Sequence, residues 1–217
     1  MIEHDTRHTA PILYLPHGGG PMPLMGDASH AGMIAFWKAM AARFPKPDAI
    51  IMISAHWEAS TATVNAATSP GMLYDYYNFP AETYEYQYPA PGNPTLAKQV
   101  IDLFGQHSIS ATAELDRGYD HGVFVPMMLM YPEADIPCVQ LSLLENLHAQ
   151  QHLDMGKALA SLRSQNILVI GSLRPAVNLR LLLQNANHAC AIGIPAQRGA
   201  SVTLERNIYC HCMFVWE

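Results

Sequence analysis

Short apolar segments alternate along the chain with segments in which apolar residues recur at helical spacing. Residues 12–15 and 49–54 are apolar, too short for a helix, and closed by a proline, a glycine or a polar residue. They therefore predict buried β-strands. Residues 136–143 and 167–171 predict two further strands of the same kind.

Helical spacing appears in three segments between these strands. Residues 33–44 carry an apolar stripe that ends at Pro45. Residues 94–104 open with a proline, which favours a helix start, and residues 147–163 form the third helical segment. The order of strands and helices predicts an α/β fold, a single layered domain with a mostly parallel central sheet flanked by helices.

The length and composition agree with one well-packed unit. The chain has 217 residues, of which 50% are hydrophobic and 14% charged, against a usual charged share of about 25%. We therefore expect residues 1–217 to form a single domain with a full core. The four cysteines are irregularly spaced, so reduced thiols are expected.

The last part of the chain differs from the body. Residues 1–171 contain 16 acidic and 8 basic residues, whereas residues 172–217 contain 2 acidic and 4 basic residues. Three of the four cysteines lie there, and no sustained strand or helix period follows Leu183. We interpret residues 173–217 as an atypical C-terminal segment.

Charge and hydropathy argue against two classes of partner. The formal net charge is -6 and the chain has no basic run, so nucleic acid is not an expected partner. The longest apolar run, residues 123–130, is interrupted by Pro126 and is far shorter than the ~20 residues of a membrane span. The first residues are mixed in charge and lack an apolar leader, which predicts a cytoplasmic protein.

A long segment without periodicity, residues 71–94, is rich in tyrosine and punctuated by proline and glycine. Long loops within a compact domain are often functional, and tyrosines favour an ordered cover. We predict that residues 74–88 cover a ligand site. The alternative is a surface loop whose tyrosines only pack.

Two histidines follow the first two predicted strands. His17 stands in LPHGGGP after residues 12–15, and His56 stands in ISAHWE after residues 49–54. Ligands of open α/β sheets bind at the carboxyl ends of strands, and neighbouring strands are ~5 Å apart. Each histidine alone is most simply a satisfied or solvated side chain. The pair predicts a shared metal ion, for which imidazole suits iron(II) or zinc.

A third candidate, His121, lies in the sequence DRGYDHGVFVP, in a predicted turn before the apolar run. A histidine near a metal can exchange a proton at neutral pH, and a nearby carboxylate such as Asp120 can orient it. Six other histidines fall on the leading residues, on loops or on polar helix faces and receive no role: His4, His8, His30, His107, His148 and His152.

Five motifs occur in order between about residues 11 and 172: HGGGP, SAHW, YPAPGNPTLA, RGYDHGVFVP with YPEADIPCVQLSL, and ILVIGS. Together they resemble the class III extradiol aromatic ring-opening dioxygenases, in particular the 4,5-DOPA dioxygenase branch. The resemblance implies a non-haem Fe(II) or Zn(II) site with His17 and His56 as ligands and His121 as a substrate-facing acid/base residue. The implied partners are a small aromatic diol and O2.

The sequence departs from this family after the last motif. Where the family has GSGxxxHNLR, this chain has GSLRPAVNLR, so Leu173 replaces a glycine and Val177 replaces a histidine of the metal site. A late histidine ligand of the family also has no counterpart in residues 181–217.

Three functions therefore stay open at the level of sequence. The first is an extradiol dioxygenase that cleaves a catechol such as DOPA. The second is a non-catalytic relative that binds a metal or a ligand. The third is a hydrolase that uses the same histidines to hold zinc and activate water. A requirement for O2 would separate the first from the other two.

Overall fold

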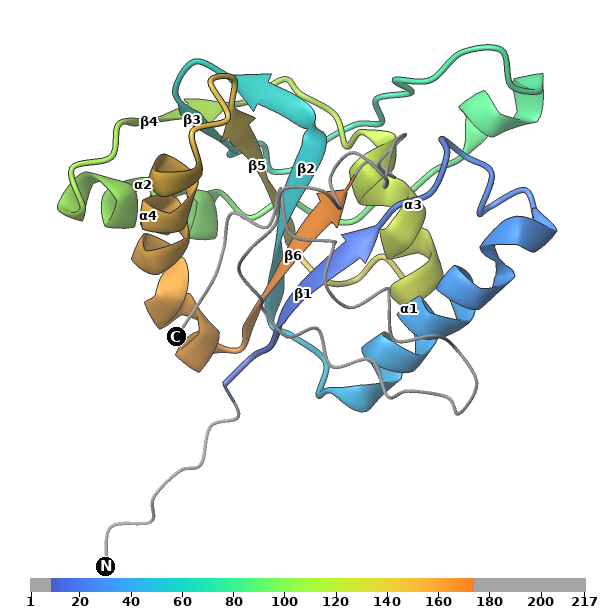
Figure 1. The fold of residues 1–217 in the computed structure, drawn as a ribbon, viewed down its shortest axis with the longest axis horizontal. Coiled ribbons are helices and arrows are strands. Elements are labelled where there is room, and N and C mark those ends of the chain that lie inside the picture. The colour runs from blue at the N-terminus through green and yellow to red at the C-terminus, as the bar shows by residue number, and fades with distance from the viewer. Residues whose placement is uncertain (1–8, 174–217) are drawn as a thin grey trace, which may run out of the picture.

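A computed structural model describes residues 9–173. These residues form a six-stranded sheet in the order β1-β6-β2-β5-β3-β4, with helices on both faces (Figure 1). The strands are β1 Ile12–Pro16, β2 Ala49–Ala59, β3 Ala62–Asn65, β4 Ala111–Glu114, β5 Cys138–Leu144 and β6 Ile167–Leu173. The helices are α1 Ala31–Arg43, α2 Pro94–Gln106, α3 His121–Met130 and α4 Ala149–Leu159, with short 3-10 turns at Ala28–His30, Ala81–Glu85 and Ala160–Gln165.

The sheet is mostly parallel, as predicted. Strands β1, β6, β2 and β5 pair in parallel, and so do β3 and β4. Only the contact between β3 and β5, through Val64 and Leu141, is antiparallel. The reason is local, because only Ser60 and Thr61 separate β2 from β3, and so short a connection reverses the chain direction.

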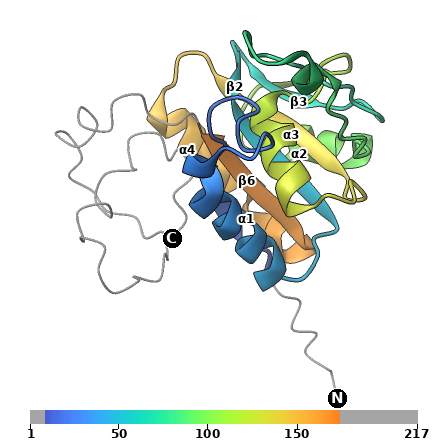
Figure 2. The same ribbon diagram turned by 90° about the vertical axis from the view of Figure 1, so that its right-hand side faces the viewer.

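Two cores cover the two faces of the sheet. Ile50 and Met52 of β2 belong to the core under α1 and α3, whereas Ile51 and Ile53 belong to the core under α2 and α4. Figures 1 and 2 show these helix pairs on opposite faces. Because successive side chains of a strand point to opposite faces, a strand buried on both sides needs an unbroken apolar run. The two cores therefore confirm the layered α/β fold.

Strands β3 and β4 and helix α3 were not predicted. The two strands have four residues each, ATVN and ATAE, and carry little apolar pattern. Helix α3 is apolar on nearly every side, so its sequence shows no helical period. It also contains Pro126, which has no backbone N–H and normally argues against a helix. The prediction that His121 lies in a turn was therefore wrong, since His121 is the first residue of α3.

The predicted extent of the domain and the atypical character of residues 173–217 stay predictions, because residues 174–217 lie outside the described part. Within residues 9–173, none of the helices combines the length and the apolar character that a bilayer-spanning helix needs.

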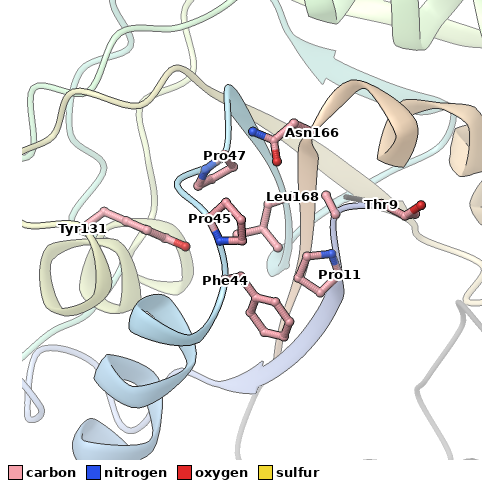
Figure 3. Close-up of a pocket in the computed structure, with 9 residues that line it drawn as sticks. Thr9, Pro11, Phe44, Pro45, Pro47, Tyr131, Asn166 and Leu168 are labelled. Carbon is pink, nitrogen blue, oxygen red and sulfur yellow. The ribbon is translucent and has the colours of Figure 1, made fainter. Parts of the chain in front are cut away.

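A small cavity of about 110 Å³ lies at the amino ends of the strands (Figure 3). Its walls include Pro11, Pro47 and Asn166, which stand just before β1, β2 and β6. Functional histidines were expected at the carboxyl ends of these strands. The cavity is therefore at the opposite edge of the sheet and takes no part in the site described below.

His152 does not lie on a polar helix face, as the sequence suggested, but is completely buried in α4. Its Nε2 accepts the backbone N–H of Leu144 at 3.0 Å, and its Nδ1 lies 2.9 Å from the carbonyl oxygen of His148. The imidazole thus joins the end of β5 to the start of α4. Burial lowers the pKa of His152.

This burial predicts a loss of stability in acid. The unfolded chain binds a proton at His152 near pH 6.5, whereas the folded chain does so only at a lower pH, so the free energy of unfolding falls as pH drops below about 6.5. Urea unfolding at about pH 7.5 and pH 5.5 should show a smaller acid loss in His152→Gln than in the parent. Exposed His107→Gln is the control, and an equal acid loss in all three proteins would contradict the prediction.

Candidate metal centre

Three histidines from three separate elements meet at the carboxyl edge of the sheet. His17 follows β1, His56 lies in β2, and His121 begins α3. Their ring centroids are 4.6 Å apart for His17 and His56, 5.1 Å for His17 and His121, and 4.0 Å for His56 and His121. One nitrogen from each ring lies within 4.8 Å of the others. The structure thus brings together the three residues that the sequence singled out.

A tight glycine turn positions His17. Gly18 has φ +80°, and a Cβ there would lie 2.7 Å from the ring of Pro23 and 2.9 Å from the ring of His30. Only glycine tolerates both the left-handed backbone and this close packing. His30, which was given no role, also accepts the N–H of Gly19 through Nε2 at 3.4 Å. The turn therefore holds the backbone directly after His17 in place.

His56 occupies an irregularity inside β2 rather than the position after it. The strand was expected to end at Ser54 but continues to Ala59, and its register with β5 shifts between Ile53 and Glu58. Such a shift frees backbone groups from the ladder and re-aims side chains. Here the His56 N–H donates to Ser54 Oγ at 3.1 Å, and Arg117 donates to the His56 carbonyl at 3.3 Å.

Asp120 holds both side chains that contact the His56 backbone, Ser54 and Arg117. It is fully buried and accepts hydrogen bonds from Ser54 at 2.7 Å, from Arg117 at 3.0 Å and from the amide of Gln140. Three donors, one of them a guanidinium, compensate the cost of burying a carboxylate. Asp120 thus ties β2 and β5 to the start of α3 and fixes the backbone of His56.

The carboxylate that contacts the ring of His121 is Asp75, not Asp120. Asp75 Oδ1 accepts the His121 backbone N–H at 3.0 Å and lies 2.7 Å from His121 Nδ1. Its Oδ2 lies 3.5 Å from His56 Nδ1. Sequence reasoning missed Asp75, because nothing in the pattern of residues 71–94 distinguishes it from Glu82 or Glu85.

Asp75 is ionised at neutral pH. Burial opposes its ionisation, but the hydrogen bonds from the ring and backbone of His121, with the nearby charges of His121 and His56, outweigh burial and lower the pKa of Asp75 to about 2. The site therefore holds a negative charge beside two imidazoles.

Ser172 fixes the proton of His17. The Ser172 hydroxyl donates its hydrogen to the carbonyl of Gly122 in α3, so it can only accept from His17 Nδ1, which lies 2.8 Å away. The His17 ring therefore carries its proton on Nδ1 and a lone pair on Nε2. That Nε2 is 2.7 Å from Nε2 of His56.

The three histidines fit a divalent metal ion. Two imidazole nitrogens that each lie about 2.1 Å from one ion at a right angle are about 3.0 Å apart, close to the spacing of the two Nε2 atoms. A second partner on the other ring nitrogen, here Ser172 or Asp75, is typical of histidine ligands. His17, His56 and His121 could therefore hold iron or zinc, both of which accept nitrogen donors.

The tyrosine-rich segment lies at this centre, as predicted. The ring of Tyr76 is 5.9 Å from that of His121, and it packs on Tyr84, Phe79 and Phe124. The hydroxyl of Tyr76 donates to a carbonyl within the segment, that of Thr83, so the segment is ordered by its own contacts. The segment thus reaches the histidines through Asp75 and Tyr76, and not the opposite edge of the sheet.

The carboxyl end of β6 also reaches the centre, through Ser172. Leu173 is the last residue of that strand, and Val177 lies outside the described residues. The expectation that Val177 is within reach of His17 and His56 stays a prediction.

Comparison with known proteins gives a consistent result. Residues 4–172 match the family described as the catalytic LigB subunit of aromatic ring-opening dioxygenase. The chain is 45% identical to a protein named dioxygenase tasH from Hapsidospora irregularis, over 75% of this chain and 53% of the relative. It is 40% identical to the 4,5-DOPA dioxygenase extradiol of Beta vulgaris, over 73% and 59%, and 36% identical to that of Escherichia coli strain K12, over 83% and 64%.

A solved structure supports the fold. A crystal structure of an uncharacterized protein from Escherichia coli K12 superposes with a TM-score of 0.53 at 35% identity, covering 64% of this chain and 51% of that one. The chain thus spans between half and two thirds of the length of these relatives.

Proposed function

The chain belongs to the LigB family of catalytic subunits of aromatic ring-opening dioxygenases, and from this membership we propose that it opens the ring of a catechol such as DOPA with O2. The observation that carries the proposal is the cluster of His17, His56 and His121 within a family that performs this chemistry. The same membership argues against the metal-dependent hydrolase.

His17 and His56 are the proposed metal ligands, and the native ion is Fe(II) or Zn(II). When bound, the ion would supply a Lewis acid for the two diol oxygens and, as iron(II), the redox chemistry that O2 requires. The protein keeps both Nε2 atoms together by fixing the Gly18 turn after His17 and the backbone of His56.

His121 is the proposed acid/base residue. A catechol that gives up one hydroxyl proton needs a base to receive it, and a positioned imidazole can do so. His121 directs Nδ1 to Asp75, which leaves Nε2 as the nitrogen that exchanges the proton. The ring of Tyr76, 5.9 Å from that of His121, supports an aromatic substrate, since aromatic rings pack favourably on one another.

The remaining expectations stay predictions. They are the cytoplasmic location, the absence of nucleic acid and membrane partners, and the identity of the catechol. The second candidate function, a non-catalytic relative that binds metal or ligand, is favoured by Val177, because valine can neither bind a metal nor transfer a proton.

An O2-uptake assay tests the proposal. The full chain, loaded anaerobically with iron(II) and mixed with DOPA in aerated buffer, should consume O2 and DOPA in equal amounts and form a yellow ring-opened product. His121→Gln should bind iron but lower the rate by about 100-fold or more, because general acid–base catalysis contributes at least that much. Iron binding without O2 uptake, across several catechols, would instead identify the non-catalytic relative.

A further inference from the structure

We propose that Asp75 is a positioning residue that holds both His56 and His121 as the tautomers protonated on Nδ1, so that both present a lone pair on Nε2. The inference rests on the proposed function, because it concerns how the imidazoles are prepared for a metal ion and a substrate. Asp75 touches both rings from the tyrosine-rich segment, at 3.5 Å from His56 Nδ1 and 2.7 Å from His121 Nδ1.

For His121 the contact fixes the proton directly. A carboxylate is only an acceptor, so a nitrogen 2.7 Å from Asp75 Oδ1 must carry a hydrogen. The same oxygen accepts the His121 backbone N–H at 3.0 Å, which sets the position of the ring at the start of α3. Nε2 is then the basic nitrogen of His121.

For His56 the choice of tautomer decides whether the pair with His17 needs a cation. Were His56 protonated on Nε2, it would donate to His17 Nε2 at 2.7 Å, and the two rings would satisfy each other. That tautomer would place the lone pair of Nδ1 only 3.5 Å from the ionised Asp75 carboxylate, which is unfavourable. The tautomer protonated on Nδ1 removes the repulsion but leaves two lone pairs facing each other.

Two facing lone pairs at this distance repel each other, and a positive charge between them removes the repulsion. Ser172 already fixes the His17 proton on Nδ1, so Asp75 completes the arrangement on the other side. Carboxylates that accept from the second nitrogen of a histidine ligand set its tautomer and raise its basicity. Asp75 thus disfavours the direct hydrogen bond between His56 and His17 and favours an arrangement in which both Nε2 atoms can bind a cation.

The backbone around Asp75 is held firmly enough for this role. Leu73 N–H donates to the Tyr119 carbonyl at 2.8 Å, and Tyr119 N–H donates to the Gly71 carbonyl at 2.8 Å. At Gly118 a Cβ would lie 2.7 Å from the backbone of Met72, so the two segments approach as closely as glycine allows. The carboxylate is therefore placed by the fold and not by its contacts with the histidines alone.

The tautomers can be read directly in the metal-free protein. Long-range 1H–15N spectra of the full chain with 15N-labelled histidine, at about pH 8, well above the ordinary pKa of an imidazole in water, distinguish the two nitrogens of each ring. We expect His56 and His121 of the parent to be protonated on Nδ1. In Asp75→Asn, His56 should shift toward the Nε2-protonated form that free histidine favours in water.

Metal affinity is the second readout. Zinc titration of the same chains should show binding about 10-fold to 100-fold weaker in Asp75→Asn than in the parent, as for other losses of a partner of a histidine ligand. Asp102→Asn is the matched control, because Asp102 is exposed and contacts Lys98 instead of a histidine. Its tautomers and its affinity should equal those of the parent.

The outcomes separate this inference from the proposed function. Protonation of His56 on Nε2 in the parent would overturn the inference even if Asp75→Asn does not fold. Unchanged His56 and His121 tautomers in a folded Asp75→Asn would also overturn it, while zinc binding by both proteins would leave the metal centre standing. If the parent binds no metal, the proposed function fails, and the tautomers of the parent still decide the role of Asp75.

Discussion

His56→Ala and His17→Ala should each reduce the affinity for iron(II) or zinc by more than about 100-fold. The reason is that the two Nε2 atoms, 2.7 Å apart, are two of the three histidine nitrogens that the described residues offer to one ion. The loss should exceed that for a residue that only orients a ligand. Isothermal titration of the full chain with each metal measures the effect.

Stability provides the internal control for this prediction. An open site contributes less to folding than a closed structural zinc site, so the midpoint of thermal unfolding of the two variants should stay close to that of the parent. His107→Ala changes an exposed histidine in the same way and should leave affinity intact. Unchanged metal stoichiometry in both His17→Ala and His56→Ala would disprove the ligand assignment.

Gly122→Ala should damage both the fold and the centre. A Cβ at this position would lie 2.8 Å from Ser54 Oγ, 3.0 Å from His56 Cδ2 and 3.1 Å from Asp120 Oδ1. These groups cannot move away without breaking hydrogen bonds, because Ser54 donates to Asp120 and accepts the backbone N–H of His56. We expect a loss of about 1–3 kcal/mol in the free energy of unfolding, as for other overpacked sites, together with weaker metal binding.

Gly105→Ala is the matched control for this substitution. Gly105 lies in α2, and nothing stands within 4 Å of an added Cβ. Alanine is the better helix former by up to about 1 kcal/mol, so this variant should be as stable as the parent or slightly more stable. Denaturant unfolding of the three proteins, followed by zinc titration, makes the comparison. Equal stability and affinity in Gly122→Ala and the parent would contradict the packing around His56.

The sequence predicts those parts of the fold that repeat a pattern. Strands such as β2 and β6 are unbroken apolar runs, and α1 carries an apolar stripe, so local composition is enough to identify them. Helix α3 escapes prediction because burial on every side removes its period. Strand β3 escapes because four residues give too little pattern, and its pairing with β4 is decided by packing.

The candidate site divides in the same way. His17 and His56 are recognisable because each follows a predicted strand and stands beside glycine or within a specific motif. Asp75 is not recognisable, because its contacts join residues 46 positions apart in a segment that has no period. The sequence offered Asp120 as the partner of His121 only through adjacency, and adjacent residues at a helix start point in different directions.

The hydrogen bond that orients His17 depends on Pro126, a residue without a polar side chain. A helical carbonyl normally receives the N–H four residues ahead, but for Gly122 that residue is Pro126, which has none, so the carbonyl is left to the Ser172 hydroxyl. Any other residue at position 126 would bring a competing N–H and release the hydroxyl to rotate and donate toward His17 instead. The missing N–H of Pro126, one helical turn after Gly122, thus sets the direction of the hydrogen bond between Ser172 and His17. It thereby determines which nitrogen His17 offers to an ion.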